Sequence, residues 1–243
     1  MKIGIFTDSH YSSQEITCGN RYNSQSLRKI EEALHFFLEN GCELVLCLGD
    51  LIDHEGDHKK EIDNLRQAAM VFHHFSDSKN MRILCMMGNH DAFTFTKEEF
   101  YEILGEEFRP ETMVISETDD VSSSKTLFFP DTCYFADGRH YAPGDTDWTD
   151  TFLPEAENLR RELSELPEEA VIFLHQNIDP TIQKDHCLAN AAEIRRILEE
   201  SEKVRTVYQG HFHPGNETEW NGIRYVTFPA MCELEEAWFV VEI

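Results

Sequence analysis

The stretch LVLCLGDLID, Leu44–Asp53, joins an apolar run to a turn that carries two carboxylates. A short, wholly apolar run of this kind is typical of a strand that is buried on both faces of a parallel sheet. Gly49 permits a tight turn out of the strand, so Asp50 is expected at its carboxyl end. Two further runs have the same character, Ile3–Phe6 before this stretch and Ile83–Met87 after it.

Segments with helical spacing separate these apolar runs. Between the first two runs, Leu27, Ile30 and Leu34 recur at intervals that place them on one face of a helix. Residues 59–78 carry a similar apolar stripe before the third run. The order strand, helix, strand, helix, strand predicts parallel strands joined by right-handed crossovers. In open sheets of this class, ligands bind at the carboxyl ends of the strands.

The rest of the chain is expected to add strands and helices to this start. The region 95–147 is irregular, with short β-prone pieces and a hairpin turn at Asp137-Gly138. No repeat, low-complexity stretch or linker divides the sequence, so residues 1–243 are expected to form a single domain. Later segments predict helices at 154–166 and 191–201 and strands at 171–174, 204–209, 223–228 and 238–243.

The composition restricts the partners and the location of the protein. The chain has a formal net charge of −25, which disfavours nucleic acid and anionic membranes as partners. No apolar run approaches the roughly 20 residues that span a bilayer. Asp8 comes too early for a signal peptide, so a cytoplasmic protein is expected. The seven cysteines include no Cys-x-x-Cys pair, so neither a disulfide framework nor a structural zinc site is expected.

Short polar motifs follow five of the apolar runs. Imidazoles, carboxylates and one amide at the ends of neighbouring strands can converge, and this set of ligands suits divalent transition metals. Within the first and last motifs, two side chains are spaced i, i+2, so an extended backbone points both to the same side. The motifs are Asp8-Ser9-His10, Gly49-Asp50-Leu51-Ile52-Asp53, Gly88-Asn89-His90-Asp91, His175 and Gly210-His211-Phe212-His213.

Together and in this order, the five motifs resemble those of the calcineurin-like metallophosphoesterases, and the resemblance covers nearly the full chain. It implies an α/β fold, a four-layer α/β/β/α sandwich of two mixed sheets flanked by helices. It also implies a dinuclear metal-dependent phosphoric ester hydrolase in which a metal-bridging hydroxide attacks the phosphorus atom. The cofactors would be two divalent transition-metal ions, Mn, Fe, Zn or Co.

The resemblance also implies a role for each polar side chain. His90 would act as general acid or transition-state stabiliser, Asp91 would orient it, and Asp53 would support a ligand or the loop. The implied metal ligands are Asp8, His10 and His213 for the first ion, Asn89, His175 and His211 for the second, and Asp50 as the bridge.

A few other side chains are candidates for substrate binding. Arg21 and Tyr22 supply a guanidinium for a second phosphate and an aromatic ring for a base, although a plain surface arginine is an equal alternative for Arg21. His54 and His186 lie in loops after ligand-bearing strands and are candidates to face the substrate. This region resembles the branch of the family that acts on ADP-ribose, CDP-alcohols and cyclic nucleotides, but some of that branch have glutamine at the position of His10.

The sequence therefore predicts an enzyme that hydrolyses a phosphodiester or pyrophosphate bond in a small, nucleotide-like substrate. Two alternatives stay open. One is a phosphomonoesterase, including a protein phosphatase, and the other is a non-catalytic metal-binding scaffold of the same fold. Intact ligand positions favour the enzyme over the scaffold. The sequence indicates no oligomeric state.

Overall fold

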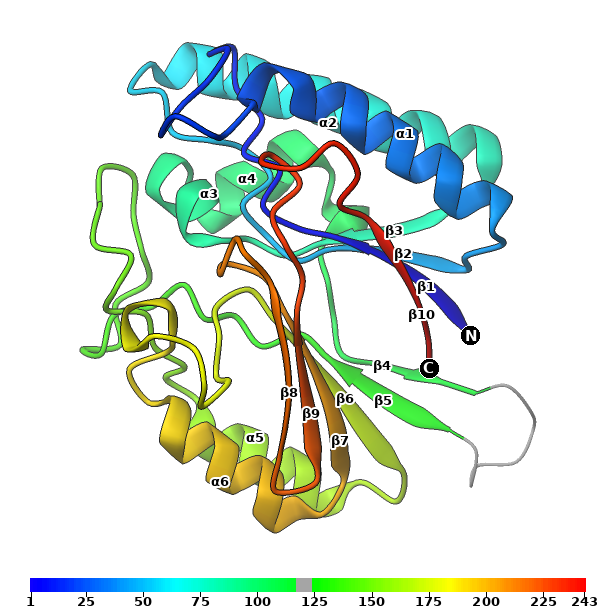
Figure 1. Cartoon of the computed structure of the whole chain (residues 1–243), viewed down its shortest axis with the longest axis vertical. Helices are drawn as coiled ribbons and strands as arrows, with labels where there is room; N and C mark the ends of the chain where they lie inside the picture. Colours follow the sequence, from blue (N-terminus) through cyan, green and yellow to red (C-terminus); the bar gives the residue numbers. More distant parts are fainter. Residues whose placement is uncertain (117–123) are drawn as a thin grey trace. The chain divides into compact units, whose positions relative to one another are not determined.

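A computed structural model describes residues 1–116 and 124–243, which fall into two compact units (Figure 1). The first unit contains Met1–Pro110, Tyr141–Thr146 and Pro229–Ile243, and the second contains Glu111–His140 and Asp147–Phe228. Each unit has one mixed sheet with helices packed against it, which confirms the predicted α/β class with two mixed sheets flanked by helices. The single domain expected for residues 1–243 stays a prediction.

The sheet of the first unit has the strand order β10-β1-β2-β3. Strands β1 (Lys2–Phe6), β2 (Leu44–Cys47) and β3 (Arg82–Cys85) are parallel, as the sequence predicts, and β10 (Phe239–Glu242) pairs antiparallel with β1. All four residues of β2 are buried, which is why this strand carries no polar side chain. The parallel order brings the carboxyl ends of β1, β2 and β3 to the same edge.

Two long helices, α1 (Ser26–Glu39) and α2 (His58–Lys79), lie side by side against the first sheet (Figure 1). The approach of α1 to the sheet is close, because a Cβ at Gly4 of β1 would lie 2.5 Å from the ring of Phe37. The shorter helices of this unit are α3 (Asn89–Thr94) and α4 (Lys97–Leu104), with 3-10 turns η1 (Asn23–Gln25) and η2 (Glu106–Phe108).

The sheet of the second unit has the order β4-β5-β6-β7-β9-β8, with antiparallel strands at both edges and parallel pairing between them. Its apolar core packs against α5 (Ala156–Glu165) and α6 (Ala191–Ser201). The 3-10 turn η4 spans Lys184–His186. The strands are β4 (Met113–Ile115), β5 (Lys125–Phe128), β6 (Glu169–Leu174), β7 (Val204–Gln209), β8 (Asn216–Trp220) and β9 (Ile223–Thr227).

Strand β8 is the one edge strand in this sheet that the sequence did not predict. It reads NETEW and is largely exposed, so it has no apolar alternation to reveal it. The hairpin with β9 is made by Asn221 and Gly222, both with positive φ, which is the backbone of a tight two-residue turn. The predicted turn at Asp137-Gly138 is confirmed, with Gly138 at φ 85°.

None of the helices in the described ranges combines the length and the hydropathy that crossing a bilayer requires.

Candidate metal centre

The loops after β1 and β2 continue the pairing of the two strands beyond the sheet. The backbone N–H of Asp8 donates to the carbonyl of Gly49 at 3.0 Å, and the N–H of His10 donates to the carbonyl of Asp50 at 2.9 Å. Tyr11 then donates to Leu51 at 2.9 Å. These bonds hold the polar residues that follow the two strands in a fixed register.

Three of these polar residues have left-handed backbone: Asp8 at φ 52°, His10 at φ 44° and Asp50 at φ 51°. Residues other than glycine hold this conformation at a cost of about 1–3 kcal/mol each, and such strain concentrates at functional sites. Glycine would adopt this backbone without steric cost, so the presence of Asp and His at these positions indicates that their side chains are required. The backbone geometry therefore points to the same residues as the motifs.

The side chains of Asp8, His10 and Asp50 form a buried cluster in which one ligand atom from each lies within 4.8 Å of the others. The Nε2 atom of His10 is 3.8 Å from Asp8 Oδ1 and 3.5 Å from Asp50 Oδ2. Burying two carboxylates side by side is unfavourable unless positive charge compensates them. Carboxylate and imidazole are suitable ligands for a divalent transition metal, so the residues present fit such an ion.

The proton affinity of His10 reflects this surplus of negative charge. Burial alone would lower the pKa of His10, but Asp53, Asp8 and Asp50 outweigh it and raise the pKa to about 10. An imidazole must be neutral to coordinate a metal, so an ion would displace this proton. The same carboxylates that stabilise the proton would stabilise the ion.

The start of α3 packs directly against Asp50. The backbone N–H of His90 donates to Asp50 Oδ1 at 2.8 Å, and Asn89 is buried at the first position of the helix. Gly88 directly precedes Asn89. A Cβ atom on residue 88 would collide with both the carboxylate and the backbone nitrogen of Asp50. Glycine is therefore required at position 88 by the close approach of the two loops.

Gly88→Ala is expected to displace Asp50 and lower the bound-metal content. We also expect turnover to fall roughly 10-fold or more, as for changes that disturb a ligand indirectly, and the free energy of unfolding to fall by about 1–3 kcal/mol from overpacking. Metal content per chain and denaturant unfolding measure the effects. Gly138→Ala is the matched control, because no atom lies within 4 Å of its Cβ position and only backbone strain at φ 85° is added. Equal metal content in the two variants would contradict the prediction.

The imidazole of His90 is oriented by Asp53, with 2.7 Å between His90 Nδ1 and Asp53 Oδ1. This corrects the sequence interpretation, which gave that role to Asp91. The carboxylate of Asp91 instead accepts backbone N–H groups from Leu51 at 3.2 Å, Ile52 at 2.9 Å and Gly88 at 2.9 Å. Asp91 is an early residue of α3, where a side chain satisfies backbone donors at the helix start, so it ties the loop after β2 to α3.

The surroundings shift the pKa values of Asp53, Asp91 and His90 in different directions. Burial would raise the pKa of Asp53, but hydrogen bonds from His10 and His90 hold it well below its usual range. Burial and the nearby carboxylate of Asp50 raise the pKa of Asp91, against three backbone hydrogen bonds that lower it. Burial also lowers the pKa of His90. Asp53 is therefore an ionised hydrogen-bond acceptor for the His90 ring.

Two candidate substrate residues, Arg21 and Tyr22, border this cluster. The guanidinium of Arg21 lies 4.0 Å from Asp53 Oδ1, and its side chain is 19% exposed. Tyr22 is 39% exposed, so its ring is accessible. The Nδ1 atom of His54 lies 3.0 Å from the carboxylate of Glu61, at the start of α2. Its predicted position facing the substrate stays a prediction.

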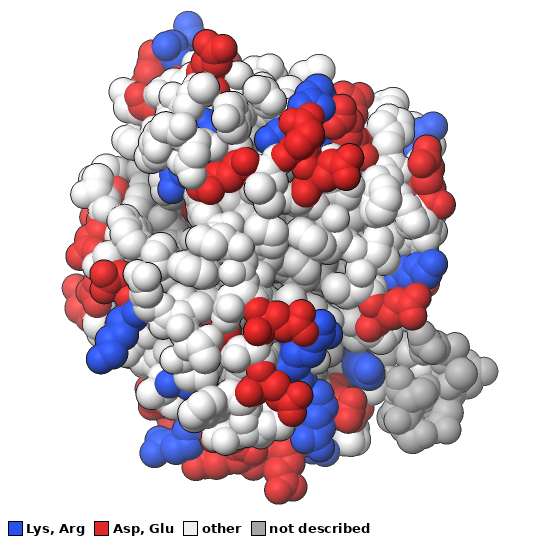
Figure 2. Space-filling model, viewed as in Figure 1, with Lys and Arg blue, Asp and Glu red and all other residues white. Residues whose placement is uncertain are grey.

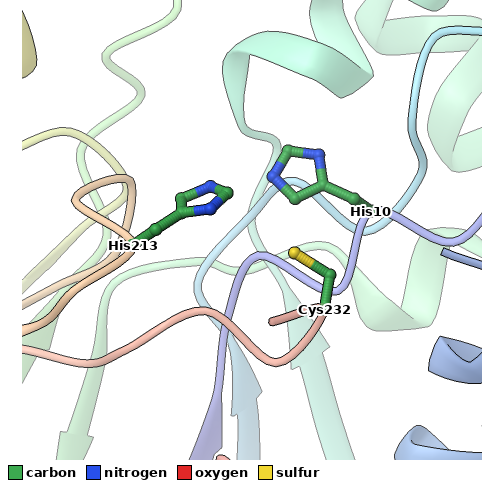
Figure 3. Close-up of side chains that lie close together, drawn as sticks. All are labelled: His10, His213 and Cys232. Atoms are coloured by element: carbon green, nitrogen blue, oxygen red, sulfur yellow. The ribbon is translucent and has the colours of Figure 1, made fainter. Parts of the chain in front are cut away.

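Cys232 is a neighbour of His10 that the sequence did not indicate. Its thiol points toward the His10 ring (Figure 3), and a ring nitrogen lies within 4.8 Å of the sulfur. The N–H of Cys232 donates to Asp8 at 3.1 Å, and its carbonyl accepts from Tyr22 at 2.9 Å. No local motif marks a cysteine that reaches the site from the far end of the chain.

The second unit holds the remaining predicted ligands at the ends of β6 and β7. His175 follows β6, and the N–H of Gly210 after β7 donates to its carbonyl at 3.0 Å. The rings of His175 and His211 have centroids 5.2 Å apart, and His211 has a left-handed backbone at φ 64°. His213, also labelled in Figure 3, is on the loop after β7.

Two partly buried rings surround His211 within this unit. The centroid of His186 is 5.6 Å from that of His211, so the structure places this predicted residue beside a predicted ligand. The ring centroid of Trp148 lies 5.7 Å from that of His211 and 5.0 Å from that of His186. Sequence reasoning missed Trp148, which lies in an irregular segment where no strand end marked it.

Comparisons with known proteins give consistent results. The sequence profile of a family described as calcineurin-like phosphoesterase matches residues 1–215. A stretch of 78 residues is 31% identical to the 3′,5′-cyclic adenosine monophosphate phosphodiesterase CpdA of Haemophilus influenzae, covering 30% of this chain and 28% of that protein.

Two crystal structures show the same fold. A dimetal phosphatase from Danio rerio matches with a TM-score of 0.77 at 18% identity, over 98% of this chain and 91% of that one. The protein TT1561 of Thermus thermophilus matches with a TM-score of 0.60 at 10% identity, over 96% of this chain and 90% of the other. At these identities the structural likeness concerns the fold alone.

Proposed function

This chain belongs to the calcineurin-like phosphoesterase family, whose enzymes are hydrolases that use two divalent metal ions, and from this premise we propose that it hydrolyses a phosphodiester or pyrophosphate bond in a small, nucleotide-like molecule. The observation that supports the proposal best is the buried cluster of Asp8, His10 and Asp50, which adjoins the hydrogen-bonded pair His90 and Asp53. The cluster provides metal ligands, and the pair provides a positioned imidazole beside them.

The ligand assignment that we propose follows the order of the family motifs. Asp50 would be the ligand shared by the two ions, because a carboxylate has two oxygens that can act as ligands. When bound, two ions of this kind activate a water molecule and neutralise charge on the phosphoryl oxygens. The residues that would hold the ions are Asp8, His10 and His213 for one and Asn89, His175 and His211 for the other.

The protein groups carry the remaining chemistry. A negatively charged phosphodiester beside the ring would favour the protonated form of His90, which would then donate its Nε2 proton to the oxygen of the departing group. The ionised carboxylate of Asp53 accepts from Nδ1 and holds the imidazole in the required direction. Asp91 fixes the relative position of Asp50 and His90 through the backbone. Arg21 binds a second phosphate, and Tyr22 offers a ring for a base.

Two observations support a small substrate. The relative from Haemophilus influenzae is a cyclic AMP phosphodiesterase by its name, and cyclic AMP is a small diester. The net charge of −25 opposes the approach of a polyanion such as nucleic acid. Figure 2 shows Asp and Glu side chains at many places on one face, several beside Lys or Arg, with no broad basic patch on that face.

A hydrolysis panel with Mn²⁺ tests the proposal. We expect the protein to lose activity with a chelator and regain it with Mn²⁺. We also expect at least about 10-fold higher kcat/KM for one or more of bis-p-nitrophenyl phosphate, cyclic AMP, ADP-ribose and CDP-choline than for p-nitrophenyl phosphate, because binding a second substituent contributes about 1.4 kcal/mol or more to the transition state.

The other outcomes of the panel distinguish the alternatives. A preference for p-nitrophenyl phosphate would identify a phosphomonoesterase. Inactivity on all five compounds, together with absence of bound metal in the purified protein, would identify a non-catalytic scaffold. Activity that survives removal of all metal would contradict the metal-dependent mechanism.

A further inference from the structure

Asn23, in η1, is fully buried and uses every hydrogen-bonding position of its side chain. Its amide nitrogen donates to the carbonyl of His10 at 2.7 Å and to Asp53 Oδ2 at 2.9 Å. Its amide oxygen accepts from the backbone N–H of Thr17 at 3.1 Å and from the Thr17 hydroxyl at 2.8 Å. No motif in the sequence marks this residue.

These contacts divide the two oxygens of Asp53 between two functions. Oδ1 faces the imidazoles, at 2.7 Å from His90 Nδ1 and 3.4 Å from His10 Nδ1. Oδ2 accepts from Asn23 and, at 3.3 Å, from the Thr17 hydroxyl. Because a carboxylate is planar, fixing Oδ2 also fixes the direction in which Oδ1 points. The amide of Asn23 thus sets the position of the atom that holds the His90 ring.

The same amide connects this pair to the segment that carries Arg21. Thr17 and Arg21 exchange backbone hydrogen bonds of 3.0 and 3.1 Å, so they form the ends of a short hairpin. Asn23 is bonded to Thr17 on one side and to Asp53 on the other. The hairpin and the His90–Asp53 pair are therefore joined through one side chain.

We propose that Asn23 is a positioning residue that acts through Asp53 on His90 and keeps the Thr17–Arg21 hairpin in register with them. The proposal rests on the proposed function, because it assigns His90 the transfer of a proton to the leaving group. A carboxylate that is free to rotate would hold the imidazole less firmly, and residues that support a reacting group in this way typically contribute about 10–100-fold.

The test compares two diesters that differ in leaving group, methyl phenyl phosphate and methyl p-nitrophenyl phosphate, with Mn²⁺ present. Phenolate is the poorer leaving group and depends more on a proton from His90. Asn23→Ala is expected to lower kcat for methyl phenyl phosphate by about 10–100-fold and for methyl p-nitrophenyl phosphate by less than about 3-fold, with metal content unchanged. His90→Asn is expected to show the same selectivity to a larger extent.

A second variant of Asn23 and a control variant at another buried asparagine complete the test. Asn23→Asp retains the side-chain volume and the acceptor for Thr17, but places a carboxylate oxygen against Asp53, so we expect it to show the same selectivity as Asn23→Ala even if the alanine variant folds poorly. Asn64→Ala is the control, because Asn64 on α2 is also buried and hydrogen-bonded, to Glu55 at 2.7 Å, without contacting Asp53. It is expected to affect both substrates equally.

The outcomes separate this proposal from the proposed function. Equal loss on both diesters in both Asn23 variants, with selective loss in His90→Asn, would reject the role of Asn23 alone. Absence of selectivity in His90→Asn would reject proton donation by His90 and the role of Asn23 with it. A wild-type protein that hydrolyses neither diester nor any compound of the panel would reject the proposed function itself.

Discussion

Asp50→Asn is expected to remove most of the bound metal and to lower turnover by more than about 100-fold, since even residues that only support a ligand contribute about 10–100-fold. The substitution replaces one oxygen by an amide nitrogen, which cannot coordinate a cation. Asn tolerates the left-handed backbone at φ 51° better than most residues. Its remaining oxygen can still accept the N–H of His90, now at 2.8 Å from Asp50 Oδ1. The fold should therefore survive while the metal is lost.

Metal analysis per chain and kcat/KM with Mn²⁺ measure this effect. Asp63→Asn is a suitable control, since Asp63 is 56% exposed on α2 and its carboxylate forms a surface pair with Arg66 at 3.4 Å. It should retain metal content and activity. Full metal occupancy in Asp50→Asn would mean that Asp50 does not bridge the two ions.

His90→Asn is expected to lower kcat by about 10²–10⁴-fold, the usual contribution of a positioned general acid, with metal content near that of the wild type. The substitution leaves the backbone N–H that donates to Asp50 in place, so the position of the Asp50 carboxylate is preserved. What disappears is the imidazole that Asp53 holds at 2.7 Å. In His90→Asn we therefore expect kcat to fall while the metal content stays unchanged, whereas in Asp50→Asn both quantities fall.

Steady-state kinetics and metal analysis on the same preparations test this separation. His58→Asn is the matched control, because His58 on α2 is 49% exposed and pairs with Glu99 at 2.9 Å on the surface. We expect it to keep wild-type kcat. A normal rate in His90→Asn would remove His90 from the mechanism, and a parallel loss of metal would show that its role is structural.

The sequence predicts the first unit well because its three parallel strands are largely buried on both faces. Runs such as Leu44–Cys47 admit no polar residue, so both their length and their ends are visible in the sequence. The polar motif after each run could therefore be placed at a strand end. The exposed strand Asn216–Trp220 has no such constraint and was missed. The family match over residues 1–215 confirms the resemblance that these motifs carried.

The partner of His90 and two further residues of the candidate site depend on contacts that the spacing of residues in the sequence does not reveal. Asp91 is adjacent to His90 in sequence, yet Asp53 contacts the His90 ring, because α3 turns the side chain of Asp91 back toward backbone donors. Cys232 is held at the site by its backbone N–H, which donates to the carbonyl of Asp8. Asn23 is held by its side-chain amide oxygen, which accepts from the backbone N–H of Thr17. Pairings of this kind link distant or irregular segments and leave no periodic pattern.

The left-handed backbone at Asp8, His10 and Asp50 has a consequence for protein engineering. A redesign guided only by conformational fit would favour glycine at these positions, since glycine has no steric penalty there. Selection for heat resistance without an activity assay would favour such changes, and with them the loss of candidate metal ligands. These positions should be held constant in any stabilisation campaign, because here thermostability and function call for different residues.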